Sequence, residues 1–311
     1  MKKTLWKEAI KMGKMKLKKD SRLFMVLSMT IFGTIGAFVR EISLSSGELA
    51  LFRALMALVL IGGYLLIRGG RISLKLSRKD LILLLLSGGA MGINWILLFE
   101  AYKHTTVSVA TLSYYFAPVI VTVVCPLIFK EKLKASQVIC FVISTLGLVL
   151  ILGVGAIGGD DTTGVLFGLG AAMFYASVML LNKFIKGVSD LHRTFLQILA
   201  AAVVLLPYVL ISGGVNLGGL NGGGIICLIT VGVIHTGVAY CLYFSAIKDL
   251  PGQKVALLSY IDPLVAVIVS VILLGEKMTV WQVLGGAMIL GATLFSELSS
   301  AKAKEGANDQ K

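Results

Sequence analysis

The segment Phe99-Glu-Ala-Tyr-Lys103 recurs 145 positions later as Phe244-Ser-Ala-Ile-Lys248, and the residues that follow match at the same offset. Leu112, Tyr115 and Pro118 correspond to Leu257, Tyr260 and Pro263, and further on Glu131-Lys132 and Gln137-Val138 correspond to Glu276-Lys277 and Gln282-Val283. Apolar runs match by chance, but prolines, Glu-Lys pairs and glutamines rarely match at one offset without a gap. The sequence therefore indicates a duplicated unit.

The composition indicates that both copies lie in a lipid bilayer. Hydrophobic residues make up 57% of the 311 residues and charged residues only 14%, and the mean hydropathy is +0.92. A soluble domain carries roughly 25% charged residues. So little charge cannot cover a water-soluble surface, which excludes a cytosolic enzyme, a disordered chain and a nucleic-acid binder.

Long apolar stretches recur along the whole chain and predict an all-α integral membrane protein. In lipid only helices and closed barrels satisfy the backbone, and these stretches are too long for the roughly ten-residue strands of a barrel. Ten transmembrane helices are predicted, at residues 23–39, 48–67, 81–101, 107–128, 136–153, 163–185, 192–211, 222–246, 254–274 and 280–297. Each copy holds five helices, so the second copy enters the membrane inverted.

The lysines and arginines predict the orientation. With a cytoplasmic N-terminus, 25 of the 29 lie on the cytoplasmic side, the opposite loops hold Arg40, Lys103 and Lys277, and Arg53 lies within a helix. Cytoplasmic loops are enriched in these residues. We expect a multi-pass protein of the cell (inner) membrane with both termini cytoplasmic, and the net charge of +13 then needs no nucleic acid. The expected organisation is a basic N-terminal segment (1–22), repeat 1 (23–153), repeat 2 (163–297) and a cytoplasmic tail (298–311).

Many secondary transporters are built from two inverted repeats within one chain. A family resemblance is carried by Trp95-Ile-Leu-Leu-Phe-Glu-Ala-Tyr, Ser113-Tyr-Tyr-Phe-Ala-Pro-Val, His235-Thr-Gly-Val-Ala-Tyr-Cys-Leu-Tyr-Phe-Ser-Ala-Ile, and Ser259-Tyr-Ile-Asp-Pro-Leu with Gly275-Glu. On these segments the chain resembles the drug/metabolite transporter superfamily, in its branch with two EamA domains. The resemblance covers nearly all of residues 23–297. It implies ten helices, a central cavity and transport by alternating access.

We expect a secondary active transporter of small organic solutes, with export of amino acids or related metabolites favoured by the resemblance alone. The alternatives are an importer or exchanger of nucleotide-sugar or drug-like solutes and, from another class, a membrane-embedded receptor or enzyme. The sequence contains no Walker motif, zinc signature or nucleophile–base pattern, so we expect no enzyme, metal or cofactor. The expected partners are a small-molecule substrate, the lipid bilayer and, as candidate coupling ion, a proton.

Asp262 and Arg53 are the sharpest candidates for substrate binding, because a charge at the centre of a membrane helix costs about 2.5–3.5 kcal/mol on insertion scales. Ala117 occupies the position of Asp262 in the first repeat, so the architecture does not require a carboxylate there. We expect Asp262 to bind a cationic group or exchange a coupling proton. Arg53 is suited to a substrate carboxylate. The alternative for both is structural, with Arg53 paired to Glu48 or to Asp262.

Other candidates surround these two charges. Pro118 and Pro263 each remove a helix hydrogen bond at matched positions, which favours a hinge over a passive kink. A polar and aromatic set, of which we expect half to face the cavity, consists of Asn94, Trp95, Tyr114, Tyr115, Tyr240, Tyr243 and Tyr260. His235 is a further substrate-binding candidate, with packing as its alternative. Glu131 and Glu276 are expected to form salt bridges at helix ends.

Overall fold

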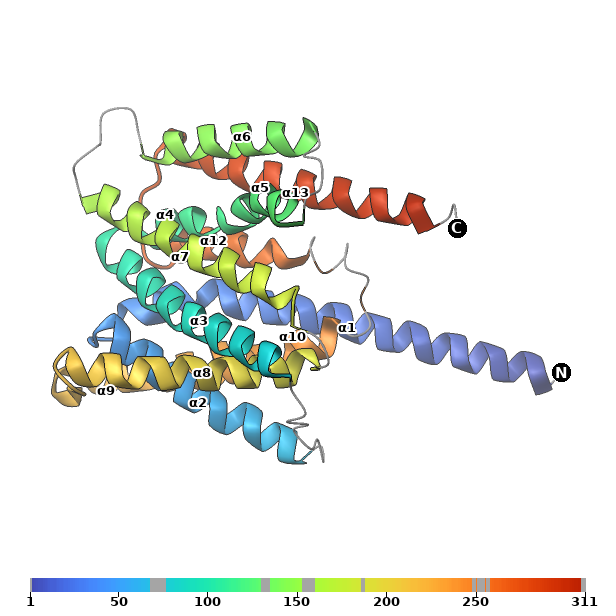
Figure 1. Ribbon diagram of the computed structural model, residues 1–311, viewed down its shortest axis with the longest axis horizontal. Helices are drawn as coiled ribbons and strands as arrows, with labels where there is room; N and C mark the ends of the chain where they lie inside the picture. The colour runs from blue at the N-terminus through green and yellow to red at the C-terminus, as the bar shows by residue number, and fades with distance from the viewer. Residues whose placement is uncertain are drawn as a thin grey trace.

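The chain forms a bundle of helices that run roughly along one direction (Figure 1). We describe it from a computed structural model, which defines the backbone of residues 2–67, 77–129, 135–152, 160–185, 188–247, 250, 255 and 258–308. These residues contain helices and turns but no strand, as the sequence predicts. The basic loop residues 68–76 and Glu131 lie outside the described residues.

The helices match the predicted membrane spans. Their bounds are α1 Lys2–Arg40, α2 Ser46–Ile67, α3 Arg78–His104, α4 Val107–Tyr114, α5 Ala117–Phe129, α6 Ala135–Leu152, α7 Asp160–Asn182, α8 Asp190–Ile211, the 3₁₀ turn η1 Leu217–Gly219, α9 Gly222–Thr230, the π-helical η2 Val231–Val238, α10 Ala239–Ile247, α12 Ile261–Ile272 and α13 Val280–Asn308. Within the described residues, seven stretches are long and apolar enough to cross a membrane, and Gln137–Ile151, Ile261–Ile272 and Val280–Ser296 are shorter apolar helices. The ten predicted membrane helices are thus confirmed.

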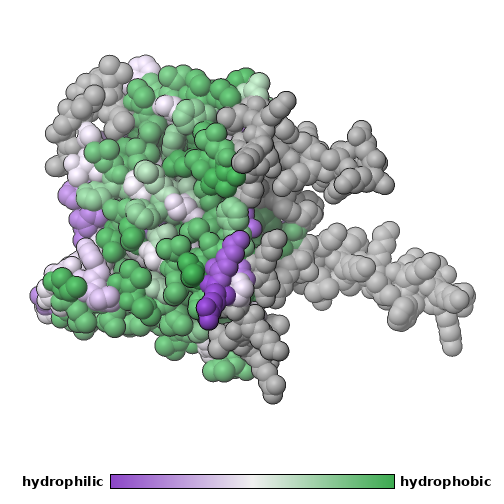
Figure 2. Space-filling view, in the orientation of Figure 1, coloured by the Kyte–Doolittle hydropathy of each residue, from purple (hydrophilic) through white to green (hydrophobic). Residues whose placement is uncertain are grey.

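The outer surface of the bundle is suited to lipid. Large apolar side chains such as Val59, Ile67 and Ile211 are at least three-quarters exposed, and a broad hydrophobic surface covers the visible face in Figure 2. Both termini lie at the same end of the bundle (Figure 1). An even number of membrane crossings requires this arrangement.

The two repeats pack against each other rather than as separate bodies. The most extensive helix contacts join α3 to α7 and α8, α13 to α6, α1 to α12 and α10, and α2 to α8 and η2. Each of these pairs takes one helix from each half of the chain. The space enclosed by the bundle is therefore walled by both repeats.

Within the described residues of the spans, helix regularity is lost at three places. Pro118 has no N–H to donate to the Tyr114 carbonyl, and the chain turns at Tyr115–Phe116 between α4 and α5, where Phe116 N donates to the Ser113 carbonyl at 3.1 Å. In the second repeat a turn at Tyr260 precedes α12, which contains Pro263. The third place is η2, in the span built from α9, η2 and α10. The matched prolines thus coincide with matched breaks, and their role as hinges stays a prediction.

Small residues let helices from the two halves approach closely. A Cβ placed on Gly88 of α3 would lie 2.5 Å from both the Cβ of Ala200 and the carbonyl oxygen of Gln197 in α8. A contact this short cannot be relieved by rotating a side chain. Gly63 of α2, by contrast, has nothing within 4 Å of its position for a Cβ.

Gly88→Ala should destabilise the protein by about 1–3 kcal/mol, because the added methyl group forces α3 and α8 apart. Gly63→Ala serves as the matched control, and it should be neutral or stabilising by up to about 1 kcal/mol, because alanine favours helix more than glycine does. Thermal unfolding of the purified variants in detergent micelles measures both. Equal stability of the two variants would contradict the close packing of α3 on α8.

Candidate functional site: a central cavity

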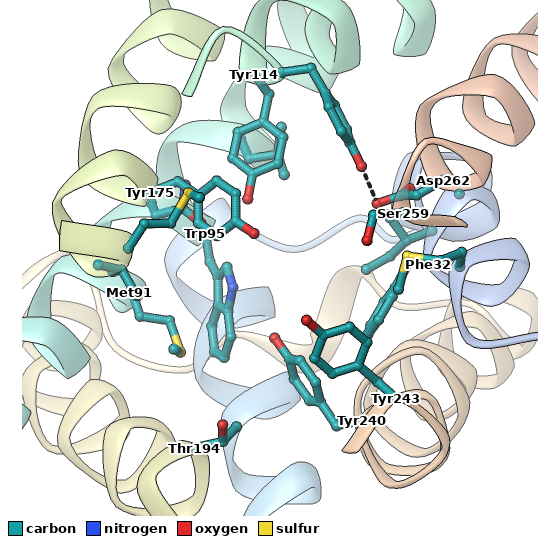
Figure 3. A pocket seen from close by; sticks show the side chains of 18 of the residues that line it. Phe32, Met91, Trp95, Tyr114, Tyr175, Thr194, Tyr240, Tyr243, Ser259 and Asp262 are labelled. Carbon is teal, nitrogen blue, oxygen red and sulfur yellow. Dashed lines mark hydrogen bonds between the residues drawn. The ribbon is translucent and has the colours of Figure 1, made fainter. Parts of the chain in front are cut away.

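A cavity of about 770 Å³ lies inside the bundle and is lined by residues of α1–α5, α7, α8, α10 and α12. Figure 3 shows aromatic side chains from several of these helices pointing into it. The predicted site residues in its lining are Arg53, Asn94, Trp95, Tyr114, Tyr115, Tyr240, Tyr243, Tyr260 and Asp262, together with Pro118. His235 and Pro263 do not line it.

Arg53 sits in the wall formed by α2 and is only 5% exposed. Its Nε donates a hydrogen bond to Thr236 Oγ1 at 2.7 Å, and its guanidinium carbon lies 4.5 Å from the centroid of the Trp95 ring. Such a cation–π contact contributes about 2 kcal/mol when desolvated. Neither Nη atom has a hydrogen-bond partner within the described part of the chain. The guanidinium is held through one edge and one face, which leaves its Nη donors available to a ligand.

The ion pairs considered for Arg53 from the sequence do not form. Among the described residues, no carboxylate lies within 4 Å of its guanidinium. The Glu48 carboxylate instead accepts hydrogen bonds from the backbone N–H groups of Ser45 at 2.9 Å and Asn216 at 2.7 Å. Glu48 therefore ties the start of α2 to the loop after α8, and the expectation of an Arg53–Glu48 pair is wrong for this conformation.

Thr236 holds Arg53 because it lies in the π-helical turn. Its hydroxyl donates to the carbonyl of Val231, five residues earlier, at 3.0 Å, and its oxygen accepts from Arg53. The side chain is fully buried. Short π-helical stretches are frequent at functional sites. Sequence reasoning missed Thr236, since a threonine in an apolar span looks like a packing residue.

Asp262 lies in the first turn of α12, just after the helix break at Tyr260. Its Oδ2 accepts a hydrogen bond from the Tyr115 hydroxyl at 2.6 Å, marked by the dashed line in Figure 3. Tyr115 lies at the corresponding break in the first repeat. Within the described residues this carboxylate has no cationic partner. The two repeats thus meet at Asp262, which carries a negative charge into the cavity when ionised.

The remaining lining combines aromatic and polar side chains with aliphatic ones such as Met91 and Leu98. Tyr114 stacks on Tyr175 with ring centroids 5.1 Å apart, and Tyr240 meets Phe32 edge to face at 5.3 Å. The Asn94 amide donates to the Ala171 carbonyl at 2.7 Å and so joins α3 to α7. Such walls offer flat apolar faces with hydroxyl groups at their edges.

The cavity extends toward the end of the bundle where the termini lie. Its lining includes Asn182 at the end of α7, Arg193 and Gln197 in the first turns of α8, and Ile247 at the end of α10. Gln197 Nε2 donates to the Ser87 hydroxyl at 2.5 Å and to Asn182 Oδ1 at 2.6 Å. These polar groups were not among the predicted site residues.

His235 packs beside the cavity instead of lining it. It is 2% exposed, its Nε2 lies 2.9 Å from Thr34 Oγ1, and its ring contacts Phe38 with centroids 4.9 Å apart. These contacts join η2 to α1. They favour the packing alternative, and a direct role in substrate binding stays a prediction.

A duplicated helical bundle with an apolar outside and a central cavity that contains the charged side chains Arg53 and Asp262 is the architecture of a membrane transporter. Residues 21–153 and 162–298 each match the EamA-like transporter family, and the chain belongs to this family of the drug/metabolite transporter superfamily. It is therefore a multi-pass membrane transporter of a small molecule and not an enzyme.

Similar proteins agree with this assignment. The chain is 32% identical over 279 residues to "Uncharacterized transporter YxxF" of Bacillus subtilis (strain 168), with 88% of each chain covered. It is 26% identical over 221 residues to "Uncharacterized inner membrane transporter YhbE" of Escherichia coli (strain K12), with 68% of each covered. A solved structure described only as "Crystal structure of protein" shares the fold, with a TM-score of 0.62, 16% identity, and coverage of 91% of this chain and 98% of that one.

Thr236→Val should destabilise the protein by about 1–3 kcal/mol, because it leaves the buried Nε–H of Arg53 without an acceptor. Thr236→Ser retains the oxygen and should stay close to the unmodified protein. The measurement is thermal unfolding in micelles. Unchanged stability of the valine variant would contradict the role of the hydroxyl, and a larger loss in the serine variant would mean that the methyl group is what matters.

Proposed function

We propose that this protein is a secondary active transporter that exports amino acids or closely related zwitterions by alternating access. The single observation that carries the proposal is the placement of Arg53 and Asp262 in one cavity without an ion pair between them. A guanidinium favours a substrate carboxylate, with up to two parallel hydrogen bonds. A carboxylate favours a substrate ammonium group. One zwitterion can satisfy both charges when it enters.

The aromatic walls narrow the substrate class. Trp95, Tyr114 and Tyr240 offer ring faces beside the two charges. Aromatic pairs contribute about 0.5–1.5 kcal/mol beyond the burial of their area. We therefore favour amino acids with aromatic or large apolar side chains. A nucleotide sugar carries phosphates without a cation, and an ionised Asp262 would repel it.

The direction of transport is inferred from the shape of the cavity. The lining residues of α7, α8 and α10 extend toward the end that carries the termini. With the termini in the cytoplasm, as the positive charges of the loops favour, this form loads a solute from the cytoplasm. A relative named as an inner membrane transporter supports location in the cell membrane.

Purified protein in proteoliposomes should move at least one zwitterionic amino acid in a screen of amino acids and metabolites, and Arg53→Gln should reduce that flux at least about 30-fold. The loss corresponds to roughly 2 kcal/mol for a buried charge contact. In the unmodified protein, the flux of the decarboxylated amine should be lower than that of the amino acid. It should change little in Arg53→Gln, because the amine has no carboxylate for Arg53 to bind.

Arg78→Gln is the matched control, since it removes one exposed positive charge at the start of α3, outside the cavity lining. It should leave both fluxes unchanged. Equal losses of zwitterion and amine flux in Arg53→Gln would show that Arg53 does not bind the carboxylate. Binding without flux would favour a receptor.

Asp262→Asn should insert into the membrane normally and abolish both the zwitterion flux and its response to an imposed pH gradient, because the amide neither pairs with an ammonium group nor exchanges a proton. Flux with and without the gradient is the measurement, and Glu41→Gln, which removes an exposed carboxylate, is the control. Gradient-driven flux that survives in Asp262→Asn would exclude Asp262 as the coupling group.

A further inference from the structure

At the end of the bundle opposite the termini, one ion pair joins the two repeats. Arg40 Nη1 at the end of α1 lies 2.8 Å from Oε1 of Glu276, which lies in the turn between α12 and α13. The Glu276 side chain is only 6% exposed, whereas that of Arg40 is 34% exposed. The other ion pairs of the described residues connect Glu100 with Lys103 and with His104, all within α3. The pair Arg40–Glu276 therefore differs from them in both burial and position.

Glu276 is held by more than Arg40. Its carboxylate accepts hydrogen bonds from the backbone N–H of Val107, the first residue of α4, at 2.9 and 3.2 Å, and from the Ser270 hydroxyl. A carboxylate is stabilised at a helix N-terminus by the positive end of the helix dipole. Gly275, with φ of +66°, turns the chain just before Glu276, which lies four residues after the end of α12. A side chain of the second repeat thus caps a helix of the first.

Arg40 binds the same helix junction from the other side. Its Nε donates to the Tyr102 carbonyl at 3.2 Å, and its Nη2 donates to the Thr105 carbonyl. Both carbonyls lie at the junction between α3 and α4, where helix ends leave acceptors without partners. Arg40 and Glu276 together tie the end of α1, the α3–α4 junction and the α12–α13 turn into one unit.

This unit lies where the cavity stops. The lining residues of α3 and α4 nearest to it are Tyr102 and Thr111, and neither Arg40 nor Glu276 lines the cavity. The cavity extends instead toward the end with the termini. In alternating access, the end that is now closed must open, and the elements joined by Arg40 and Glu276 belong to the two repeats that have to separate there.

We infer that Glu276, with Arg40, is the latch that closes the mouth of the cavity at the end opposite the termini, and that the mouth opens when Glu276 leaves the α4 N-terminus. The inference rests on the proposed alternating access, but not on the identity of the solute. When the mouth opens, water takes over the hydrogen bonds of both charges. The hydrogen bonds of Arg40 and Glu276 therefore stabilise the closed mouth, and their replacement by water allows it to open reversibly.

Accessibility labelling tests the latch without a substrate. The probe is a charged, membrane-impermeant methanethiosulfonate that modifies Thr111→Cys, in a chain whose four native cysteines are replaced. Thr111 lines the cavity and is 4% exposed. The reagent is applied to intact cells and to inverted vesicles, with a C-terminal tag to identify the face that carries the termini. Glu276→Gln should accelerate labelling from the opposite face several-fold and slow it from the face of the termini.

Glu100→Gln is the matched control, because it removes a carboxylate at the same end of the bundle whose contacts stay within the first repeat. Its ion pairs lie within α3, and its carboxylate also accepts a hydrogen bond from the Ser46 hydroxyl of α2 at 2.5 Å. It should leave labelling at both faces unchanged. Arg40→Gln should accelerate labelling less than Glu276→Gln, since Glu276 keeps its contacts with Val107 and Ser270. Equal labelling rates in Glu276→Gln, Arg40→Gln and the parent chain would overturn the latch.

A cross-link answers the same question if Glu276→Gln fails to insert. Arg40→Cys and Glu276→Cys, joined by a short bis-methanethiosulfonate, should make a thiol in the cavity unreactive from the face opposite the termini, and a reductant should restore reactivity. Unhindered labelling of the cross-linked chain from that face would also overturn the latch. An unaffected zwitterion flux that still depends on Arg53 would then leave the proposed function standing.

Discussion

Inside a bilayer every backbone N–H and C=O group needs a partner within the protein or in a water-lined cavity, since an unpaired one costs several kcal/mol. This chain gives up helix regularity at Tyr115–Phe116, at Tyr260 and through η2. Tyr115 and Tyr260 line the cavity, and η2 supplies the hydroxyl that holds Arg53. At the two matched breaks, irregular backbone is tolerated because it borders the cavity rather than lipid, whereas no residue of η2 lines the cavity. The position of the cavity follows from the same constraint that makes the rest of the chain helical.

The same reasoning separates structural charges from functional ones. Glu48 is buried and the Glu276 side chain is only 6% exposed. Each accepts hydrogen bonds from backbone N–H groups at the loops and helix ends that it joins. Arg53 has one hydroxyl and two aromatic rings around it, and Asp262 has one hydroxyl. Neither set of contacts neutralises the charge of the residue that it surrounds. A charge that the protein keeps in the membrane without neutralising it is most simply explained by a ligand that does so.

The fold could be predicted from the sequence because two of its causes are visible there. The duplication leaves matched residues at one offset, and the membrane environment requires long apolar runs. It also predicted part of the lining, and all seven members of the polar and aromatic set lie at the cavity, where we expected half of them. The contact of Thr236 with Arg53 and the position of His235 outside the cavity lining could not be predicted, because a π-helical turn changes which side chains share a face. The partner of Glu276 was equally hidden, since Lys277 follows it directly and Arg40 is remote in sequence.

The repeats share their shape but not their chemistry. Prolines and tyrosines recur at the matched helix breaks, whereas Asp262 corresponds to Ala117. We expect the symmetric residues to let either end of the bundle open, because inverted copies can exchange conformations. In the proposed function, the asymmetric charges near the centre meet a solute whichever end is open. Arg193 and Asn182 lie toward one end only, so we expect them to contact a solute only while that end is open. On this proposal, recognition depends on the central pair, and the polar residues near the termini act on entry.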